Sequence, residues 1–479
     1  MKPDLEKLQP IDRIAMILIV LLSLIMGLLV WNGDRAVPYI RDFSWQNQLI
    51  GAEDNFFTLT FSRPMDRTSV EANLQTEPPL NGKFSWVGRR AIYTLNAPVQ
   101  YATSYQVKLR QAQENFTNQG QTRKLIQPFV GNFRTRDRSL AYIGVTGAEK
   151  GRLILYNLTK KQKTILTPPD WVVEDFKPYP DGKRILFSAS EWASYKPGLF
   201  EAQLQAVTTE VDLSTGKPAG EISLVLDNHN YQNLKFDLSA DGQVIVIQRA
   251  DRDNLGNFSL WVLRPDSPPQ PLDNKPGGEF AIAPDSESVA IALEEGVTLL
   301  PLTPAGKPLD FFPKFSRILS FSRDGTAAAM VKFNSDYTRS LFFINNQGVQ
   351  KELLKASEIV SCQFDPRSPI IYCLASQALK GKEQIFLTAI DIATTKVTPL
   401  LPLPDRRDTQ MSLSPDGSTL LIDNVVATGK LPEEGELTTP EGAAIATSNI
   451  LLLSLPKTLN SPLQPEQLPL TGFQPRWLP

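Results

Sequence analysis

The sequence predicts an all-β protein preceded by one apolar helix, and three observations lead to this prediction. A strand–turn–strand pattern recurs six times between residues 176 and 422. The 479 residues include 38 prolines and 28 glycines, and so many turn-forming residues favour short strands over long helices. Residues 14–31 form one uncharged, apolar run near the N-terminus.

The N-terminal run has the length of a membrane-spanning helix. It reads IAMILIVLLSLIMGLLVW, and at ~1.5 Å rise per residue it extends roughly 27 Å, close to the hydrocarbon thickness of a bilayer. The basic residues around it favour a cytoplasmic N-terminus. We predict a cytoplasmic tail at 1–13, a single-pass transmembrane anchor at 14–31, and a periplasmic or extracellular position for the rest. A cleaved signal peptide is the alternative, although no A-x-A site follows the run.

Residues 37–136 show several short strands separated by turns. Residues 57–61 (FTLTF) and 105–109 (YQVKL) alternate apolar and polar side chains, as half-buried strands do. Strands at this spacing predict an Ig-like β-sandwich of about a hundred residues.

Four stretches of this region resemble the SbsA-type bacterial Ig-like domain. They are residues 61–66 (FSRPMD), 82–86 (GKFSW), 103–107 (TSYQV) and 133–135 (FRT). The resemblance implies a spacer or adhesive module without a catalytic group. Trp86 and Tyr105 are accordingly interpreted as core residues.

The rest of the chain, 139–479, carries the repeat. Each copy is a strand, a turn similar to Ser-Pro-Asp-Gly, and a second strand. In the turn, proline fixes φ, aspartate bonds back to the backbone and glycine takes φ > 0, so we interpret the aspartates as turn formers rather than metal ligands. In the fifth copy Arg367 and Ser368 replace Asp-Gly. The six copies span 176–187, 236–247, 280–291, 319–330, 362–373 and 411–422.

Two further strand-like runs lie between successive copies, which makes four strands per unit, the composition of a β-propeller blade. Residues 470–479 look like the opening of a seventh copy, whereas 140–143, 153–156 and 163–166 are three strands without an inner partner. We therefore predict that the last strand pairs beside 140–143 and closes the ring, which removes exposed sheet edges. This gives seven blades, with six or eight as alternatives because boundaries read from sequence are soft.

The repeat over 139–479 resembles the TolB-type propeller repeat, which is related to WD-repeat propellers. The resemblance implies a propeller that presents one face to a partner, in a bacterial envelope protein.

Cys362 and Cys373 are the only cysteines and lie eleven residues apart. The other copies have apolar pairs at this offset, which places the two positions across a hairpin, with Cβ atoms about 4.5–5.5 Å apart. That separation is near the one a disulfide needs, and a compartment outside the cytoplasm permits oxidation. We predict a disulfide, the alternative being two buried thiols.

Composition and motifs exclude several functions. Lys+Arg number 49 and Asp+Glu 51, so no basic field exists for a nucleic acid. One histidine and two cysteines are too few for a usual zinc site. The sequence has no G-x-S-x-G, P-loop or G-x-G-x-x-G, and no cofactor is predicted. Residues 251–262 resemble a calcium loop faintly, but Leu255 and Val262 stand where ligands are required, so we predict a polar hairpin.

Propellers gather the loops between blades, and those between second and third strands, on one face. Exposed aromatic residues beside charges suit recognition there, although some of them can simply pack. His229 is interpreted as a solvated loop residue with at most a binding role. The acidic insertion 428–448 is predicted to be a flexible loop. The candidates for a partner-binding face are Trp171, Trp192, Tyr195, His229, Tyr231, Asp251, Asp253 and Tyr337.

These observations predict a membrane-tethered scaffold or binding protein, not an enzyme, whose propeller face meets a protein or glycan partner. One alternative is a propeller enzyme, a hydrolase or lyase acting at the central channel, which requires converging acidic or histidine groups. Another is a purely structural surface protein without a specific partner.

Overall fold

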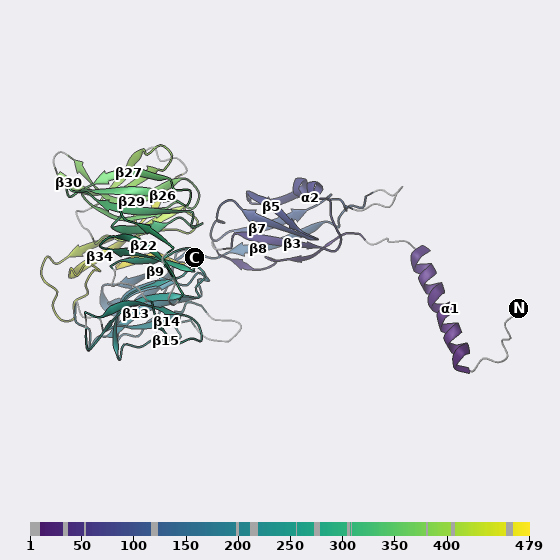
Figure 1. Ribbon diagram of the computed structural model, residues 1–479, viewed down its shortest axis with the longest axis horizontal. Helices are drawn as coiled ribbons and strands as arrows, with labels where there is room; N and C mark the ends of the chain where they lie inside the picture. Colours follow the sequence, from purple (N-terminus) through teal and green to yellow (C-terminus); the bar gives the residue numbers. More distant parts are fainter. Residues whose placement is uncertain are drawn as a thin grey trace. The chain divides into compact units, whose positions relative to one another are not determined.

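The computed structural model confirms that the chain is all-β (Figure 1). By internal contacts the chain divides into two compact units. The first comprises 1–47, 56–94 and 105–133, and the second comprises 48–55, 95–104 and 134–479. The structure describes residues 10–31, 37–51, 54–115, 123–197, 201–210, 219–254, 256–272, 278–303, 307, 309–379, 382–403, 408–456 and 463–479.

Helix α1 (Pro10–Trp31) covers the predicted membrane anchor. No helix within the described part of the chain combines the length and the apolarity that crossing a membrane requires. The predicted transmembrane anchor at 14–31, and the single-pass, periplasmic or extracellular localisation that depended on it, are therefore wrong. The predicted tail at 1–13 lies mostly outside the described residues.

Two four-stranded sheets occupy the region 40–135. Alternation decides which side chains enter the core: in β3, every second residue from Phe57 to Phe61 is buried. Tyr105 is buried and stacks on Phe133, with ring centroids 5.0 Å apart. The strands, in sheet order, are β1 (Ile40–Phe43), β3 (Phe56–Phe61), β6 (Arg90–Leu95) and β5 (Gly82–Val87), then β2 (Leu49–Ile50), β8 (Phe129–Thr135), β7 (Ser104–Leu109) and β4 (Leu74–Glu77).

The FSRPMD motif is explained by a helix start. Asp66 is the N-cap of α2 (Arg67–Asn73), and its Oδ1 accepts a hydrogen bond of 2.8 Å from the backbone N–H of Ser69. Trp86 is half-buried rather than a core residue, and its Nε1 donates to Glu71 at 2.8 Å.

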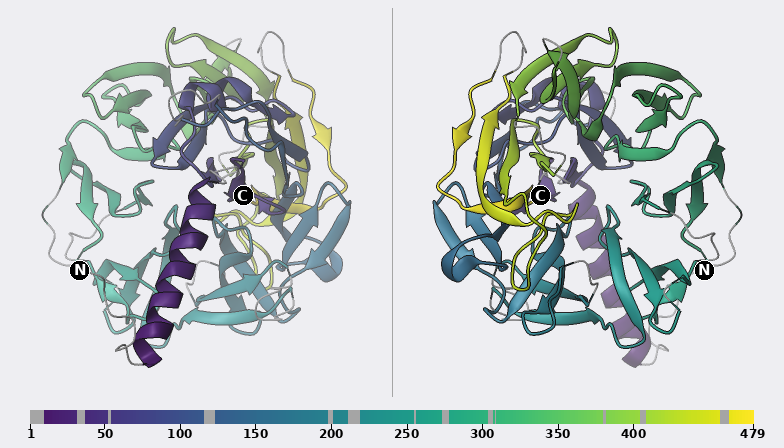
Figure 2. Two further views of the ribbon diagram at one scale, coloured as in Figure 1. Left: turned by 90° about the vertical axis from the view of Figure 1, so that its right-hand side faces the viewer. Right: turned by 90° about the vertical axis from the view of Figure 1, so that its left-hand side faces the viewer.

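Within the described residues, the range 139–479 forms seven four-stranded sheets, which Figure 2 shows around a common centre. The first four strand sets are β9 (Ser139–Gly144), β10 (Leu153–Asn157), β11 (Gln162–Ile165) with β36 (Gly472–Trp477); β12 (Trp171–Pro178), β13 (Arg184–Glu191), β14 (Gln203–Thr208), β15 (Ile222–Leu226); β16 (Tyr231–Leu238), β17 (Ile245–Asp251), β18 (Phe258–Leu263), β19 (Gln270–Pro271); and β20 (Phe280–Ile282), β21 (Ser288–Leu293), β22 (Gly296–Pro301), β23 (Asp310–Phe312). The remaining sets are β24 (Arg317–Phe321), β25 (Ala327–Phe333), β26 (Arg339–Asn345), β27 (Gln350–Ala356); β28 (Ile359–Phe364), β29 (Ile370–Leu379), β30 (Lys382–Asp391), β31 (Val397–Pro402); and β32 (Met411–Leu413), β33 (Thr419–Ala427), β34 (Ile445–Ser454), β35 (Glu466–Gln467). A 3₁₀ turn, η2 (Gly147–Glu149), lies between β9 and β10.

The predicted pairing of the C-terminal strand is confirmed. β36 runs antiparallel beside β9, with Phe473 opposite Ile143 and Trp477 opposite Leu140. β36 thus takes the innermost position of a sheet whose other strands come from the other end of this unit's sequence.

The repeated hairpins form as predicted in five of the six copies. Their registers pair Phe176 with Phe187, for example, and glycines such as Gly182 take positive φ in the turns. The fourth copy differs, because Ile318 and not Leu319 lies opposite Met330. A β-bulge between Ile318 and Ser320 shifts the register by one residue.

Candidate binding face

The strand registers define two faces of the range 139–479. Connections between successive sheets, such as 227–230, and between second and third strands, such as 334–338, leave at one end, which we call the loop face. The Asp-Gly hairpins, such as 179–183, leave at the opposite end, which we call the turn face. Of the predicted residues, Trp171 and Tyr231 begin innermost strands, so both lie at the loop face.

Trp171, Trp192 and Tyr195 lie at the loop end of the sheet β12–β15. Trp192 and Tyr195 contact each other edge to face, with ring centroids 5.7 Å apart. Tyr195 is buried and its hydroxyl lies 3.3 Å from Thr438 Oγ1. Tyr195 is therefore a packing residue, whereas Trp171 and Trp192 remain half-exposed.

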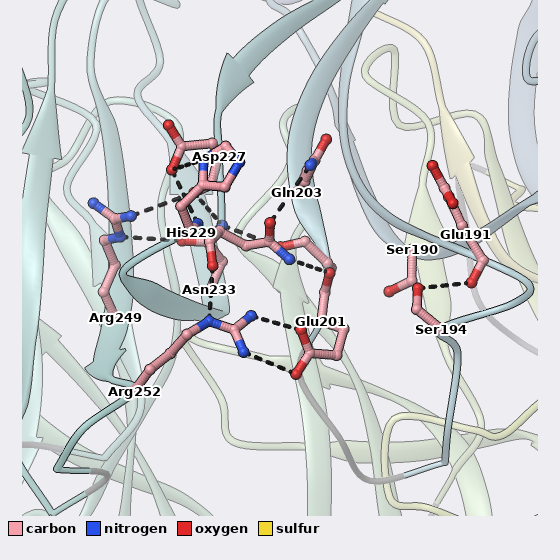
Figure 3. Close-up of polar contacts among 12 residues, drawn as sticks. Ser190, Glu191, Ser194, Glu201, Gln203, Asp227, His229, Asn233, Arg249 and Arg252 are labelled. Atoms are coloured by element: carbon pink, nitrogen blue, oxygen red, sulfur yellow. Dashed lines mark hydrogen bonds and ion pairs between the residues drawn. The ribbon is translucent and has the colours of Figure 1, made fainter.

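The segment that joins β15 to β16 is held by a polar frame (Figure 3). Arg252 forms a bidentate pair with Glu201, with nitrogen–oxygen distances of 3.1 and 2.5 Å. Its Nε donates to the carbonyl of Asn228 at 2.8 Å, and the Asn228 amide donates to the carbonyl of Glu201 at 2.6 Å. The bidentate pair thus ties the β17–β18 connection to the β13–β14 connection, and the bond from Arg252 Nε ties it to the β15–β16 connection.

Arg249 also contacts the segment that joins β15 to β16, because its guanidinium donates to the carbonyl of Asp227 at 3.3 Å. It is almost fully buried, and its Nε donates to Asn233 Oδ1 at 3.1 Å. Its guanidinium lies 4.6 Å from the ring centre of Tyr231 and 5.3 Å from that of Trp261. Burial lowers the pKa of Arg249, but an arginine remains charged at neutral pH.

The frame leaves polar side chains exposed above it. The His229 side chain is 78% exposed, and its Nδ1 lies 3.3 Å from Asp227 Oδ1. Asp253 is exposed, while Asp251 is half-exposed and accepts from the Asp253 N–H at 2.9 Å. The structure therefore brings Tyr231, His229, Asp251 and Asp253 together, whereas Tyr337 lies on another sheet, at the β25–β26 turn.

Glu174 is a functional candidate that the sequence reasoning missed. It lies at a β-bulge of the innermost strand β12, and its Oε1 accepts from the Ser190 hydroxyl at 2.6 Å. Burial raises the pKa of Glu174 to about 7, helped by the negative charges of Asp175 and Glu201 and opposed by the Ser190 hydrogen bond. Neither the bulge nor the partial burial of this side chain leaves a signal in the sequence.

The carboxyl group of Asp423 is buried and is hydrogen-bonded to the C-terminal strand β36. Asp423 on β33 accepts from the backbone N–H of Gln410 at 2.7 Å and from that of Gln474 at 2.8 Å. Burial raises its pKa to about 7, and the charge of Asp408 adds to the rise.

The innermost strands carry charges of alternating sign. Arg476 on β36 pairs with Asp175 on β12 at 2.8 Å. Glu279, just before β20, pairs with Lys235 at 3.6 Å and with Arg317 at 2.5 Å. These pairs link neighbouring sheets, and their charges largely cancel. The described residues contain no cluster of three or more potential metal ligands of the His, Cys, Asp and Glu types.

The acidic insertion 428–448 is packed against the rest of the second unit around Leu437. Leu437 is buried in the cluster that contains Tyr195, and Lys150 Nζ donates to the carbonyl of Gly435 at 2.9 Å. Leu431 at the other end of the insertion is 89% exposed. The prediction of a flexible loop is therefore wrong for the segment around Leu437.

Cys362 and Cys373 are partners across the β28–β29 hairpin and are joined by a disulfide. Their Cα atoms lie 4.1 Å apart, and both side chains are buried.

Comparison with known proteins finds matches among solved structures and none in the two other comparisons. No protein-family model matches the chain, and no curated protein matches it either. Among solved structures, TolB from Acinetobacter baumannii is 15% identical, with 80% of this chain and 81% of that chain covered and a TM-score of 0.41. An oligogalacturonate lyase from Vibrio parahaemolyticus is 13% identical, with coverage of 64% and 84% and a TM-score of 0.45. A putative 6-phosphogluconolactonase from Bacteroides fragilis is 12% identical, with coverage of 72% and 98% and a TM-score of 0.44.

Proposed function

We propose that the chain is a binding protein. In this proposal, residues 139–479 form a seven-bladed propeller whose loop face binds a protein or glycan partner. Residues 37–136 form an Ig-like module of the SbsA type that serves as a spacer. The seven four-stranded sheets with β36 beside β9, and the two sheets of the region 40–135, support this division.

The loop-face cluster carries the proposal. His229, Tyr231 and Asp253 offer exposed or half-exposed aromatic and polar groups at the ends of one sheet. Arg249 and Arg252 fix the backbone beneath them through five hydrogen bonds to the segment 227–233 and to Glu201. A rigid frame lowers the entropic cost of binding, because the contact groups are already in place.

The test compares the two faces in the full chain. We expect His229→Ala combined with Asp253→Ala to abolish capture of a partner from the producing cells and binding to a glycan array. The matched control is Lys183→Ala, an exposed change on the turn face that should leave binding intact. Equal binding by both variants, or no binding by the unaltered chain, would reject the proposal.

A second candidate function is a hydrolase or lyase that acts at the central channel. The observation that favours it is Glu174, whose pKa of about 7 suits a general acid or base at neutral pH. The assay is turnover of a panel of neutral and acidic polysaccharides by the unaltered chain and by Glu174→Gln. Turnover that Glu174→Gln removes supports this candidate, and turnover by neither protein rejects it.

A further inference from the structure

Tyr337 is the most exposed of the large apolar side chains in the described residues. It lies in the turn between β25 and β26 at the loop face, and 93% of it is accessible to solvent. A tyrosine at this position gains almost nothing from packing within the chain.

The backbone of Tyr337 adds a second observation. Its φ is 62°, in the left-handed region that bulky L-residues rarely adopt and that glycine adopts freely. The turn alone therefore favours glycine here, and the exposed ring does not compensate through packing. Other described non-glycine residues, Lys161 among them, also take positive φ. At Tyr337 the argument for a contact outside the chain therefore comes from the combination of this backbone with a fully exposed aromatic ring.

The turn is also tied by polar contacts within its hairpin. Lys355 Nζ lies 2.8 Å from Asp336 Oδ2, and the Thr338 N–H donates to Asp336 Oδ1 at 3.2 Å. Asn334 donates through its amide to the hydroxyls of Thr338 and Ser340 at 3.0 and 2.9 Å. Lys355 foremost, and then Thr338, lower the pKa of Asp336, so it is ionised at neutral pH.

The same hairpin presents a second aromatic side chain. Phe333 ends β25 and is 54% exposed, and the Arg339 guanidinium lies 5.2 Å from its ring centre. Arg339 is paired with Glu358 at 2.5 Å. The hairpin tip thus offers two accessible rings beside neutralised charges, a composition typical of the central part of protein interfaces.

We propose that Tyr337, flanked by Phe333, is an anchor that inserts into an apolar pocket of a protein partner. This inference rests on the proposed function and selects a protein as the partner. A hairpin tip is convex, whereas sites for sugars and other small ligands are concave and enclose most of the ligand. An exposed tyrosine on a hydrogen-bonded turn suits insertion into a pocket, where such residues dominate the binding energy.

The first experiment places a photo-crosslinking amino acid, p-benzoylphenylalanine, at single positions of the full chain in its producing cells. Position 337 is the test, 229 is a second loop-face position, and 161 is an exposed turn-face control. We expect one adduct of defined mass from position 337, with the partner peptide identified by mass spectrometry, and none from 161. An adduct from 229 but not 337 overturns the anchor while keeping the proposed function. Adducts from neither position overturn both, and adducts shared by 337 and 161 show non-specific contact and overturn the anchor.

The second experiment separates binding from folding. Tyr337→Gly relieves the left-handed backbone, so we expect a Tm equal to that of the unaltered chain or up to about 2 °C higher. Affinity for the crosslinked partner should nevertheless fall tenfold or more. The matched control is Lys161→Gly, because Lys161 is exposed, has φ 53° and lies on the turn face. Unchanged affinity in Tyr337→Gly, or equal losses in both variants, would overturn the anchor.

Discussion

At the scale of single residues, buried carboxyl groups are what the sequence could not predict. Asp423 and Gln474 are 51 residues apart, and only the fold brings the carboxyl of one to the N–H of the other. By contrast, the Cys362–Cys373 pairing was predictable, because an eleven-residue offset within one hairpin is a local relation. The same eleven-residue offset was wrong for Leu319 and Met330, because a single bulge residue shifts the strand register there.

The first residue-scale prediction concerns pH. Asp423 has a pKa of about 7 in the fold, against a usual value of 3.8. The folded chain therefore holds a proton that the unfolded chain has lost between these values, so stability falls as pH rises from about 4 to 7. The upper bound of this contribution is on the order of 4 kcal/mol. Chemical denaturation should show a smaller fall for Asp423→Asn than for the unaltered chain over this range. An identical pH dependence in the two proteins would show that Asp423 is not the titrating group.

The disulfide gives the second prediction. Intact mass should rise by about two mass units on reduction, and Cys362→Ser with Cys373→Ser should lower the free energy of unfolding by about 2–3 kcal/mol, because a short loop is no longer closed. Without any mass change on reduction, the bond is absent in the isolated protein.

At the scale of elements, the connections are where the prediction and the structure differ most. The insertion 428–448 has the composition of a solvated loop, yet one residue, Leu437, anchors it in a core cluster beside Tyr195. Composition averages over a segment, whereas anchoring needs only a single apolar side chain at the right place. The inner and second strands of the hairpins were predictable, because their alternation and turn residues repeat.

The third prediction compares the buried Leu437 with the exposed Leu431 of the same insertion. Leu437→Asp should release the segment, since a buried charge without a partner is costly, and limited proteolysis should then cut within 428–444 before the rest of the chain. The matched control is Leu431→Asp, because Leu431 is 89% exposed and its replacement removes no buried contact. Equal cutting of both variants would mean that Leu437 does not hold the insertion.

At the scale of the whole molecule, the pairing of β36 with β9 determines how the second unit is held together. The truncated chain 1–471 lacks β36 and exposes the inner edge of β9, so we expect aggregation and a lower Tm. A synthetic peptide of residues 470–479, added during refolding, should restore the Tm of the full chain. If the truncated chain is as stable and monomeric as the full chain, the closing strand has no such role.

The most direct test of the proposed binding face is hydrogen exchange of the full chain, with and without its crosslink-identified partner. Slower exchange on binding is expected in the loop-face segments 227–233 and 334–338, with the turn-face hairpins 179–183 and 414–418 unchanged. Protection confined to the turn-face hairpins, or to the region 40–135, would contradict the loop face as the binding surface.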